Sequence, residues 1–194
     1  MNSGLDAQAS ESGVGCLSNV RRLAVKLTLL PGPPISGSVS EEHFDAFGDC
    51  TWVHFDDEVG GCWAGAFGTH RLVDSFTVLF SDERTALVSA GGQGYLVDLT
   101  GRRLLFRTDA ILVGGITVPD RPFVVVHDWV RLYALGKEGS LWKSHRIAMD
   151  GIELLGTTEK TLHGRAWDGD WHTFTLAYDG WAIEGGSSIA AAVG

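Results

Sequence analysis

Two tryptophans, two aspartates and a histidine fall within six residues near the end of the chain. They are Trp167, Asp168, Asp170, Trp171 and His172. Aromatic rings beside carboxylates suit the recognition of sugars or cations. The alternative to a binding site is a structural turn whose flanking tryptophans point into the core. Alternation along the next strand puts Phe174, Leu176 and Tyr178 in the core and Trp171 on the surface. The five residues are therefore predicted to bind a ligand, with Trp181 as a further aromatic contributor.

The seven histidines show no spacing typical of metal ligands, such as two histidines one helical turn apart. Two pairs of neighbouring residues, His54 with Asp56 and His127 with Asp128, could belong to a metal or catalytic site. In either case, the fold would have to bring further ligands or catalytic groups from elsewhere in the chain. We therefore name no catalytic residue and no metal site, and we expect no cofactor. A hydrolase with a His/Asp site hidden in the linear sequence remains an alternative.

Acidic residues dominate the stretch between Lys26 and Arg71, which contains no lysine or arginine. They are Glu41, Glu42, Asp45, Asp49, Asp56, Asp57 and Glu58. These seven carboxylates account for most of the formal net charge of −9. One interpretation is a solvated face. The sharper hypothesis is a docking surface for a basic protein partner, because opposite charge speeds association and opposes wrong partners.

Composition narrows the class of protein. The acidic balance argues against binding to nucleic acids or anionic membranes, and no run approaches the ~20 apolar residues of a membrane span. The three cysteines, Cys16, Cys50 and Cys62, are an odd number without metal spacing. They indicate reduced thiols in a cytoplasmic protein, although a Cys50–Cys62 bridge stays open for an oxidising compartment.

Short apolar or alternating segments, separated by glycine-containing turns, predict β-strands along most of the chain. The predicted strands are Leu23–Leu30, Thr51–Phe55, Trp63–Phe67, Phe76–Phe80, Ala86–Ala90, Tyr95–Leu99, Leu104–Arg107, Ile111–Val118, Phe123–Val126, Val130–Leu135, Ser140–Lys143, Ile152–Leu155, Thr161–Trp167, Trp171–Tyr178 and Trp181–Glu184. One short helix is predicted over Ser40–Phe47, because serine is a good N-cap and acidic residues suit the first helical turn.

A strand–turn–strand unit that ends in an aromatic residue occurs twice in the middle of the chain. The turn glycines Gly101 and Gly139 are 38 residues apart, and Phe106 and Trp142 are 36 apart. Periods of about 40 residues are typical of propeller blades. The two units resemble the blades of the quinoprotein-type β-propeller repeat. They depart from it at Gly136, where a blade usually has aspartate, and at Phe106, where it has tryptophan.

The C-terminal half also resembles that of small uncharacterised bacterial proteins. The matching segments are Asp150–Ile152, Leu162–Gly164, Trp171–Thr175 and Glu184–Gly186. This resemblance implies no activity.

Length limits the architecture. A closed propeller requires about four four-stranded blades, whereas the chain has room for about three and an irregular start. We therefore expect an all-β fold of antiparallel meanders (blade-like repeats) forming a sandwich, an open barrel or an incomplete propeller, with a closed small propeller as the alternative. Residues 1–20 are predicted to be a disordered N-terminal tail, 21–186 a single all-β domain and 187–194 a frayed C-terminal tail. Phe106 and Trp142 should occupy equivalent buried positions.

Three functional hypotheses follow. The first is a non-catalytic binding protein with an acidic face for a basic protein partner, of which toxin-neutralising immunity proteins are one type. The second is a carbohydrate or small-ligand binding module that uses surface tryptophans. The third is the hydrolase with an unrecognised His/Asp site.

Overall fold

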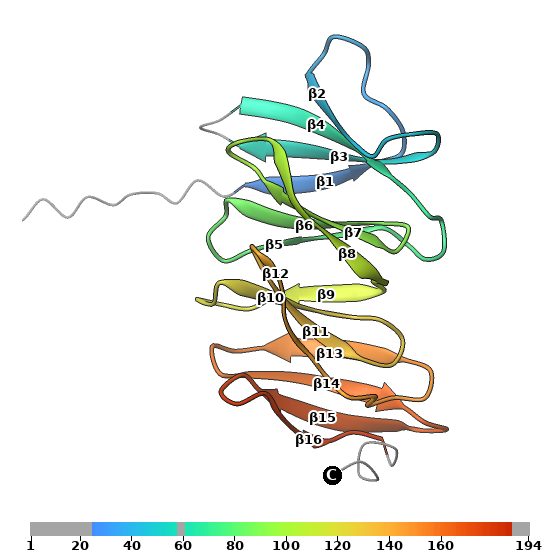
Figure 1. The fold of residues 1–194 in the computed structure, drawn as a ribbon, viewed down its shortest axis with the longest axis vertical. Helices are drawn as coiled ribbons and strands as arrows, with labels where there is room; N and C mark the ends of the chain where they lie inside the picture. Colours follow the sequence, from blue (N-terminus) through green and yellow to red (C-terminus); the bar gives the residue numbers. More distant parts are fainter. Residues whose placement is uncertain (1–24, 58–60, 188–194) are drawn as a thin grey trace, which may run out of the picture.

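The computed structural model describes residues 25–57 and 61–187, which form strands, turns and loops without a helix. The strands make four sheets of four strands each, which we call blades 1 to 4 in chain order. The blades stack one upon another from one end of the molecule to the other (Figure 1). The all-β fold predicted from the sequence is therefore confirmed.

Blades 2, 3 and 4 are antiparallel meanders in which spatial order follows sequence order. Blade 2 comprises β5 (Phe76–Leu79), β6 (Thr85–Ala90), β7 (Gln93–Asp98) and β8 (Arg103–Ile111). Blade 3 comprises β9 (Gly114–Thr117), β10 (Phe123–His127), β11 (Leu132–Gly136) and β12 (Gly139–Lys143). Blade 4 comprises β13 (Ile152–Thr157), β14 (Thr161–Trp167), β15 (Trp171–Ala177) and β16 (Ala182–Gly185).

Blade 1 is irregular. It comprises β1 (Lys26–Leu30), β2 (Ser40–Phe44), β3 (Cys50–Asp57) and β4 (Gly61–Gly68), in the spatial order β1-β3-β4-β2. The helix predicted over Ser40–Phe47 is wrong, because β2 pairs in parallel with the edge of β4. Phe44 then stacks on Phe67 with ring centroids 4.9 Å apart. Pairing and burial outweigh the weak helical preference of so short a segment.

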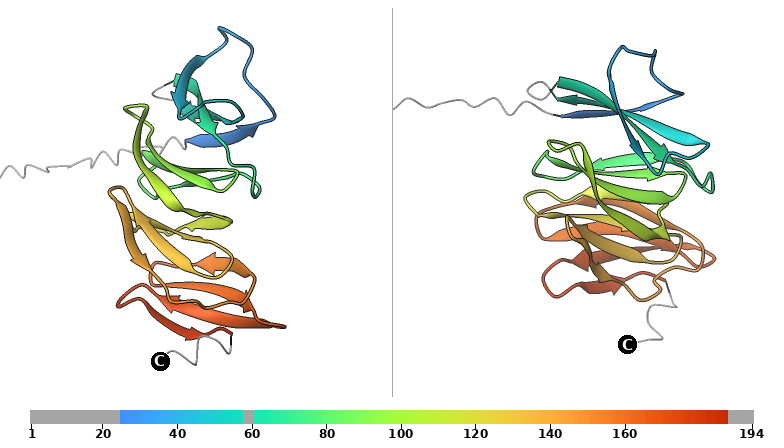
Figure 2. Two further views of the ribbon diagram at one scale, coloured as in Figure 1. Left: turned by 45° about the vertical axis from the view of Figure 1, so that its right-hand side comes forward. Right: turned by 45° about the horizontal axis from the view of Figure 1, so that its top comes forward.

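The first strands of successive blades lie against each other, so β1, β5, β9 and β13 form one continuous inner edge. Blades 1 and 4 lie at opposite ends of the stack, as Figures 1 and 2 both show. The ring of a closed propeller is therefore not formed. The fold is an incomplete propeller of four blades, which matches one of the expected architectures and excludes the closed alternative.

Three apolar layers fill the spaces between the four blades. Phe55, Trp63 and Tyr95 belong to the layer between blades 1 and 2. Leu96 and Tyr133 belong to the layer between blades 2 and 3. The third layer, between blades 3 and 4, includes Leu132, Ile147, Leu162, Phe174 and Leu176. Blades 2 and 3 thus have both faces covered, which explains why β6, β10 and β11 are buried along their whole length.

The two aromatic residues of the repeat lie at equivalent places. Phe106 pairs with Leu96 across β7 and β8, and Trp142 pairs with Ala134 across β11 and β12. Each ring packs on the face directed at the next blade, and the Trp142 ring stacks on Trp181 with centroids 4.9 Å apart. Both side chains are half-buried rather than buried, because they belong to the outermost strands of their blades.

The two predicted tails lie almost entirely outside the described residues. Residues 1–20 and 188–194 lie outside the described residues, whereas Ser187 is buried and its hydroxyl donates to the Ile147 carbonyl oxygen at 2.7 Å. Cys50 and Cys62 are free thiols at opposite ends of the β3–β4 hairpin, so the bridge left open by the sequence is not formed. Within 25–57 and 61–187, no helix could cross a membrane.

The close packing of blade 4 yields a stability prediction. A Cβ atom at Gly164 would lie 2.5 Å from Cζ of Phe174 and 2.7 Å from the Glu153 carbonyl oxygen. Gly164→Ala should therefore lower the free energy of unfolding by about 1–3 kcal/mol, as overpacking does. Gly156→Ala, where no heavy atom lies within 4 Å of the new Cβ, is the control and should stay within about 0.5 kcal/mol of the parent. Urea denaturation of both variants tests this, and equal losses would contradict it.

Candidate binding site

The predicted tryptophan site forms one hairpin. Trp167 and Trp171 are paired across β14 and β15, with ring centroids 5.5 Å apart at an interplanar angle of 65°. Trp171 is 43% exposed, as the alternation of the strand indicated. The Arg165 guanidinium lies 4.6 Å from the centre of the Trp171 ring and is held there by Glu153. One face of this tryptophan is therefore occupied by a cation from the same strand pair.

Two of the three polar side chains of the predicted site, Asp168 and His172, contact each other. The Asp168 side chain is only 5% exposed, and its carboxylate lies 2.8 Å from Nε2 of His172. Asp170 is exposed in the turn. Trp181 lies at the far end of β15, where its ring contacts Phe123. The structure thus brings the five predicted residues together but leaves Trp181 in the apolar layer between blades 3 and 4.

The seven predicted acidic residues are divided among different surroundings. Asp45 accepts a hydrogen bond from Arg107 of β8 at 2.7 Å, and Asp49 lies 2.7 Å from Arg71. Both carboxylates are therefore neutralised by arginines that come from outside the acidic stretch. Glu58 lies outside the described residues, and the Asp57 side chain is not described.

Glu41 and Asp56 share one surface with three other residues. Val53 and Phe55 point toward blade 2, so the alternation of β3 turns Trp52, His54 and Asp56 to the opposite side. His43 contacts Trp52 edge-on at 5.7 Å and lies 3.8 Å from Glu41, which puts β2 residues on the same side. We call Glu41, His43, Trp52, His54 and Asp56 the outer face of blade 1. Glu42 alternates to the other side, with Phe44.

Neither described thiol is activated. A hydrogen bond from the Cys62 thiol to Asp56, at 3.3 Å, raises the pKa of Cys62. Burial, and next the Asp49 carboxylate, raise the pKa of Cys50. Because the thiolate is the nucleophile, these surroundings oppose cysteine-based hydrolysis. Within the described residues, no group of three or more His, Cys, Asp or Glu could hold a metal ion.

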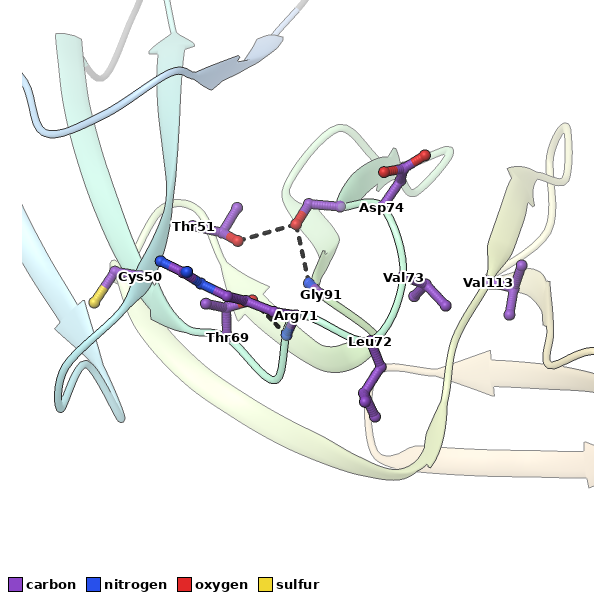
Figure 3. Close-up of a pocket in the computed structure, with 10 residues that line it drawn as sticks. Cys50, Thr51, Thr69, Arg71, Leu72, Val73, Asp74, Gly91 and Val113 are labelled. Carbon is purple, nitrogen blue, oxygen red and sulfur yellow. Dashed lines mark hydrogen bonds between the residues drawn. The ribbon is translucent and has the colours of Figure 1, made fainter.

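A polar cavity of about 710 Å³ lies where the chain passes from blade 1 to blade 2 (Figure 3). The Ser75 hydroxyl accepts a hydrogen bond from the Gly91 amide at 2.9 Å and shares another with Thr51 at 3.0 Å. Thr69 accepts from the Arg71 amide at 3.2 Å. These hydrogen bonds hold the connection between β4 and β5 against β3 and the turn after β6. The hydroxyls of this cavity therefore have a structural role.

A second cavity, of about 500 Å³, opens between the outer strands of blades 2 and 3. We call it the aromatic groove. Its apolar walls are Phe106, Ala110, Ile111, Leu112, Trp129 and Leu135. Its polar lining is Thr108, Asp109, Asp128, Tyr133, Ser140 and Lys143. Concave, largely apolar sites with a few polar groups are typical of ligand binding.

Asp128 organises the groove wall. One carboxylate oxygen accepts from the amides of Val130 and Arg131 at 2.7 and 2.6 Å, and the other accepts from the Tyr133 hydroxyl at 2.6 Å. Burial, and next the Asp128 carboxylate, raise the pKa of Tyr133 to about 12, although Arg131 opposes the shift. The Lys143 ammonium lies 5.5 Å from the centre of the Tyr133 ring.

Sequence reasoning did not find this groove. It considered His127 with Asp128 only as part of a folded metal or catalytic site. The structure shows that burial lowers the pKa of His127 and that its ring packs against Gly114. The available signal was Trp129, a large aromatic residue in a polar turn directly after Asp128.

Comparisons with solved structures give the fold. The dihydro-heme d1 dehydrogenase NirN matches with a TM-score of 0.54 and 18% identity, over 69% of this chain and 32% of that chain. A chain of the mitotic checkpoint complex matches with a TM-score of 0.51 and 11% identity, over 95% of this chain and 59% of that chain. The neighbours are β-propeller proteins, which confirms the resemblance of the repeat to propeller blades.

The chain spans less than two thirds of the length of either structure, and identities this low show the fold alone. No protein-family model matches the chain, and no curated protein matches it in sequence.

The three tyrosines of the chain give a pH prediction, because the pKa values of Tyr95, Tyr133 and Tyr178 are all raised, in each case mainly by burial. In the folded protein, phenolate absorbance should rise only above pH ~10, the ordinary tyrosine value. Tyr133→Phe should remove the step at about pH 12. A raised folded pKa means that the stabilisation is complete below pH ~10 and is lost as the pH rises through the folded value. A native phenolate step centred near pH 10 would contradict this.

Proposed function

We propose that the protein is a non-catalytic binding protein that holds a basic protein partner on the outer face of blade 1. The observation that carries the proposal is the composition of this one sheet face. Glu41 and Asp56 lie on the same side of the sheet as the half-buried Trp52 ring, opposite the layer shared with blade 2. Tryptophan is among the residues that dominate binding energy at protein interfaces.

The charges of blade 1 favour a cationic partner. The described part of this blade carries one cation, Lys26, on its four strands. Arg71 and Arg107 are paired with Asp49 and Asp45. Lys26 lies directly opposite Asp56 across β1 and β3 and so shares the outer face with it. This one cation faces the two carboxylates of Glu41 and Asp56, so the outer face keeps an excess of negative charge for a partner. Complementary charge of this kind raises the association rate and selects against acidic proteins.

A cavity on the same side of blade 1 supports the proposal. Its volume is about 580 Å³, and it is formed by Leu30, His54 and residues of the β1–β2 connection, 31–39. Ile35, in that connection, is 85% exposed. Lysine and arginine side chains pair an apolar stem with a charged head. An apolar cavity on the same side as carboxylates therefore suits such a side chain.

A toxin-neutralising, immunity-type role is one form of this function, with a basic toxin as the partner. Cytoplasmic location is part of the proposal and is supported by the free thiols of Cys50 and Cys62. The sugar-binding alternative has less support, because Arg165 covers one face of Trp171. Trp181 lies away from that hairpin.

Two matched double variants test the proposal. Glu41→Gln with Asp56→Asn removes both carboxylates from the outer face, and Glu138→Gln with Glu159→Gln removes the same charge from exposed turns of blades 3 and 4. The probe is fluorescein-labelled octa-arginine, followed by anisotropy at ionic strengths of about 0.01 and 0.15 M, where the Debye length is ~30 and ~8 Å.

The outer-face variant should bind the probe roughly three- to tenfold more weakly at the lower ionic strength, because an exposed ion pair contributes about 0.2–1 kcal/mol. Its salt dependence should also flatten, while the control stays close to the parent. Equal losses in both double variants would mean that the peptide senses only net charge, and the proposed docking surface would be wrong.

A further inference from the structure

We propose that the aromatic groove between blades 2 and 3 binds a small aromatic carboxylate, with its ring between the blades and its carboxylate at Lys143. The groove is built by strands of blades 2 and 3, whereas the docking surface above belongs to blade 1. The inference is therefore independent of the proposed function.

The shape of the groove follows from the fold. Blades 2 and 3 meet closely along their inner strands, β5 and β9. Their outermost strands are β8 and β12, and here a cavity of about 500 Å³ remains between the sheets. This volume is within the range of about 300–1,000 Å³ that small-molecule sites occupy.

The walls of the groove suit a flat ring. Phe106 is half-buried on the blade 2 side, and Leu135 is buried on the blade 3 side. Trp129 lines the groove with 39% of its surface exposed. Aromatic rings gain from offset or edge contacts with such residues in addition to the burial of apolar area.

The charged groups select the ligand. Asp128 already accepts three hydrogen bonds, from two amides and the Tyr133 hydroxyl. Asp109 is exposed. The Lys143 ammonium is placed over the Tyr133 ring at 5.5 Å, and within the described residues no carboxylate lies within 4.0 Å of it. A ligand carboxylate would therefore gain a cation without displacing an existing ion pair.

A cationic ligand fits the groove less well. It would meet the like charge of Lys143. Of the two carboxylates in the lining, Asp128 has both oxygens engaged by hydrogen-bond donors, and Asp109 is exposed, so that solvent screening weakens its attraction. The sign of the preferred ligand charge is thus a direct test of the assignment.

Three probes that share one ring system provide this test: 2-naphthoate, neutral 2-naphthylmethanol and cationic 2-naphthylmethylammonium. Each is titrated into the full chain, and the Trp129 indole resonance is followed by NMR. Naphthoate should shift this resonance saturably and bind roughly fivefold more tightly than the alcohol, because an exposed ion pair contributes up to ~1 kcal/mol.

Three variants locate the effect. Lys143→Met keeps an apolar side chain but removes the charge, so naphthoate should fall to the affinity of the alcohol. Lys160→Met, at an exposed position in the turn before β14, should leave the fivefold ratio unchanged. Ser140→Trp adds bulk at an exposed residue of the groove and should weaken both probes. Thermal unfolding verifies that each variant is folded.

Several results would overturn the proposal. They are the absence of saturable binding at Trp129, equal affinities for naphthoate and the alcohol, tighter binding of the ammonium probe, and equal effects of the Lys143 and Lys160 substitutions. The last would show that the probe responds to net charge and not to the groove.

Discussion

The rest of the structure depends on the burial of sheet faces between adjacent blades. A four-stranded sheet of this size cannot bury an apolar face alone, so each blade depends on its neighbours, as in other repeat proteins. Ion pairs also link the blades in sequence: Asp45 with Arg107, Asp82 with Lys137, and Arg121 with Asp179. Exposed pairs of this kind contribute about 0–1 kcal/mol each, so the three apolar layers dominate stability.

This constraint makes the two ends of the stack differ from its middle. Strands β6, β10 and β11 are buried on both sides, whereas β14 alternates between buried and more exposed residues. A sheet with one face in solvent shows this alternation. The uncovered faces and the rim between β8 and β12 are therefore the places where side chains are free of the packing requirement. Both proposed binding surfaces lie in such places.

The strands and the blade repeat could be predicted from sequence because both are local patterns. Apolar runs, glycine turns and the spacing of Phe106 and Trp142 carry that information without knowledge of the fold. The position of β2 could not be predicted, since it depends on parallel pairing with β4. The groove was missed for the same reason: Phe106 and Trp129 meet around it only when blades 2 and 3 pack together.

The candidate site residues show the same limit. The hairpin from Trp167 to His172 is local, and the structure brings those residues together. Arg107, by contrast, comes from a different blade and is 62 residues from Asp45 in sequence. The composition of the acidic stretch alone therefore could not show which of its carboxylates are paired with arginines. A carboxylate that forms an ion pair with an arginine of the same chain stabilises the fold and is not available to a partner. Only the carboxylates and ammonium groups left over from such pairing, Glu41 and Lys143 among them, can select what binds.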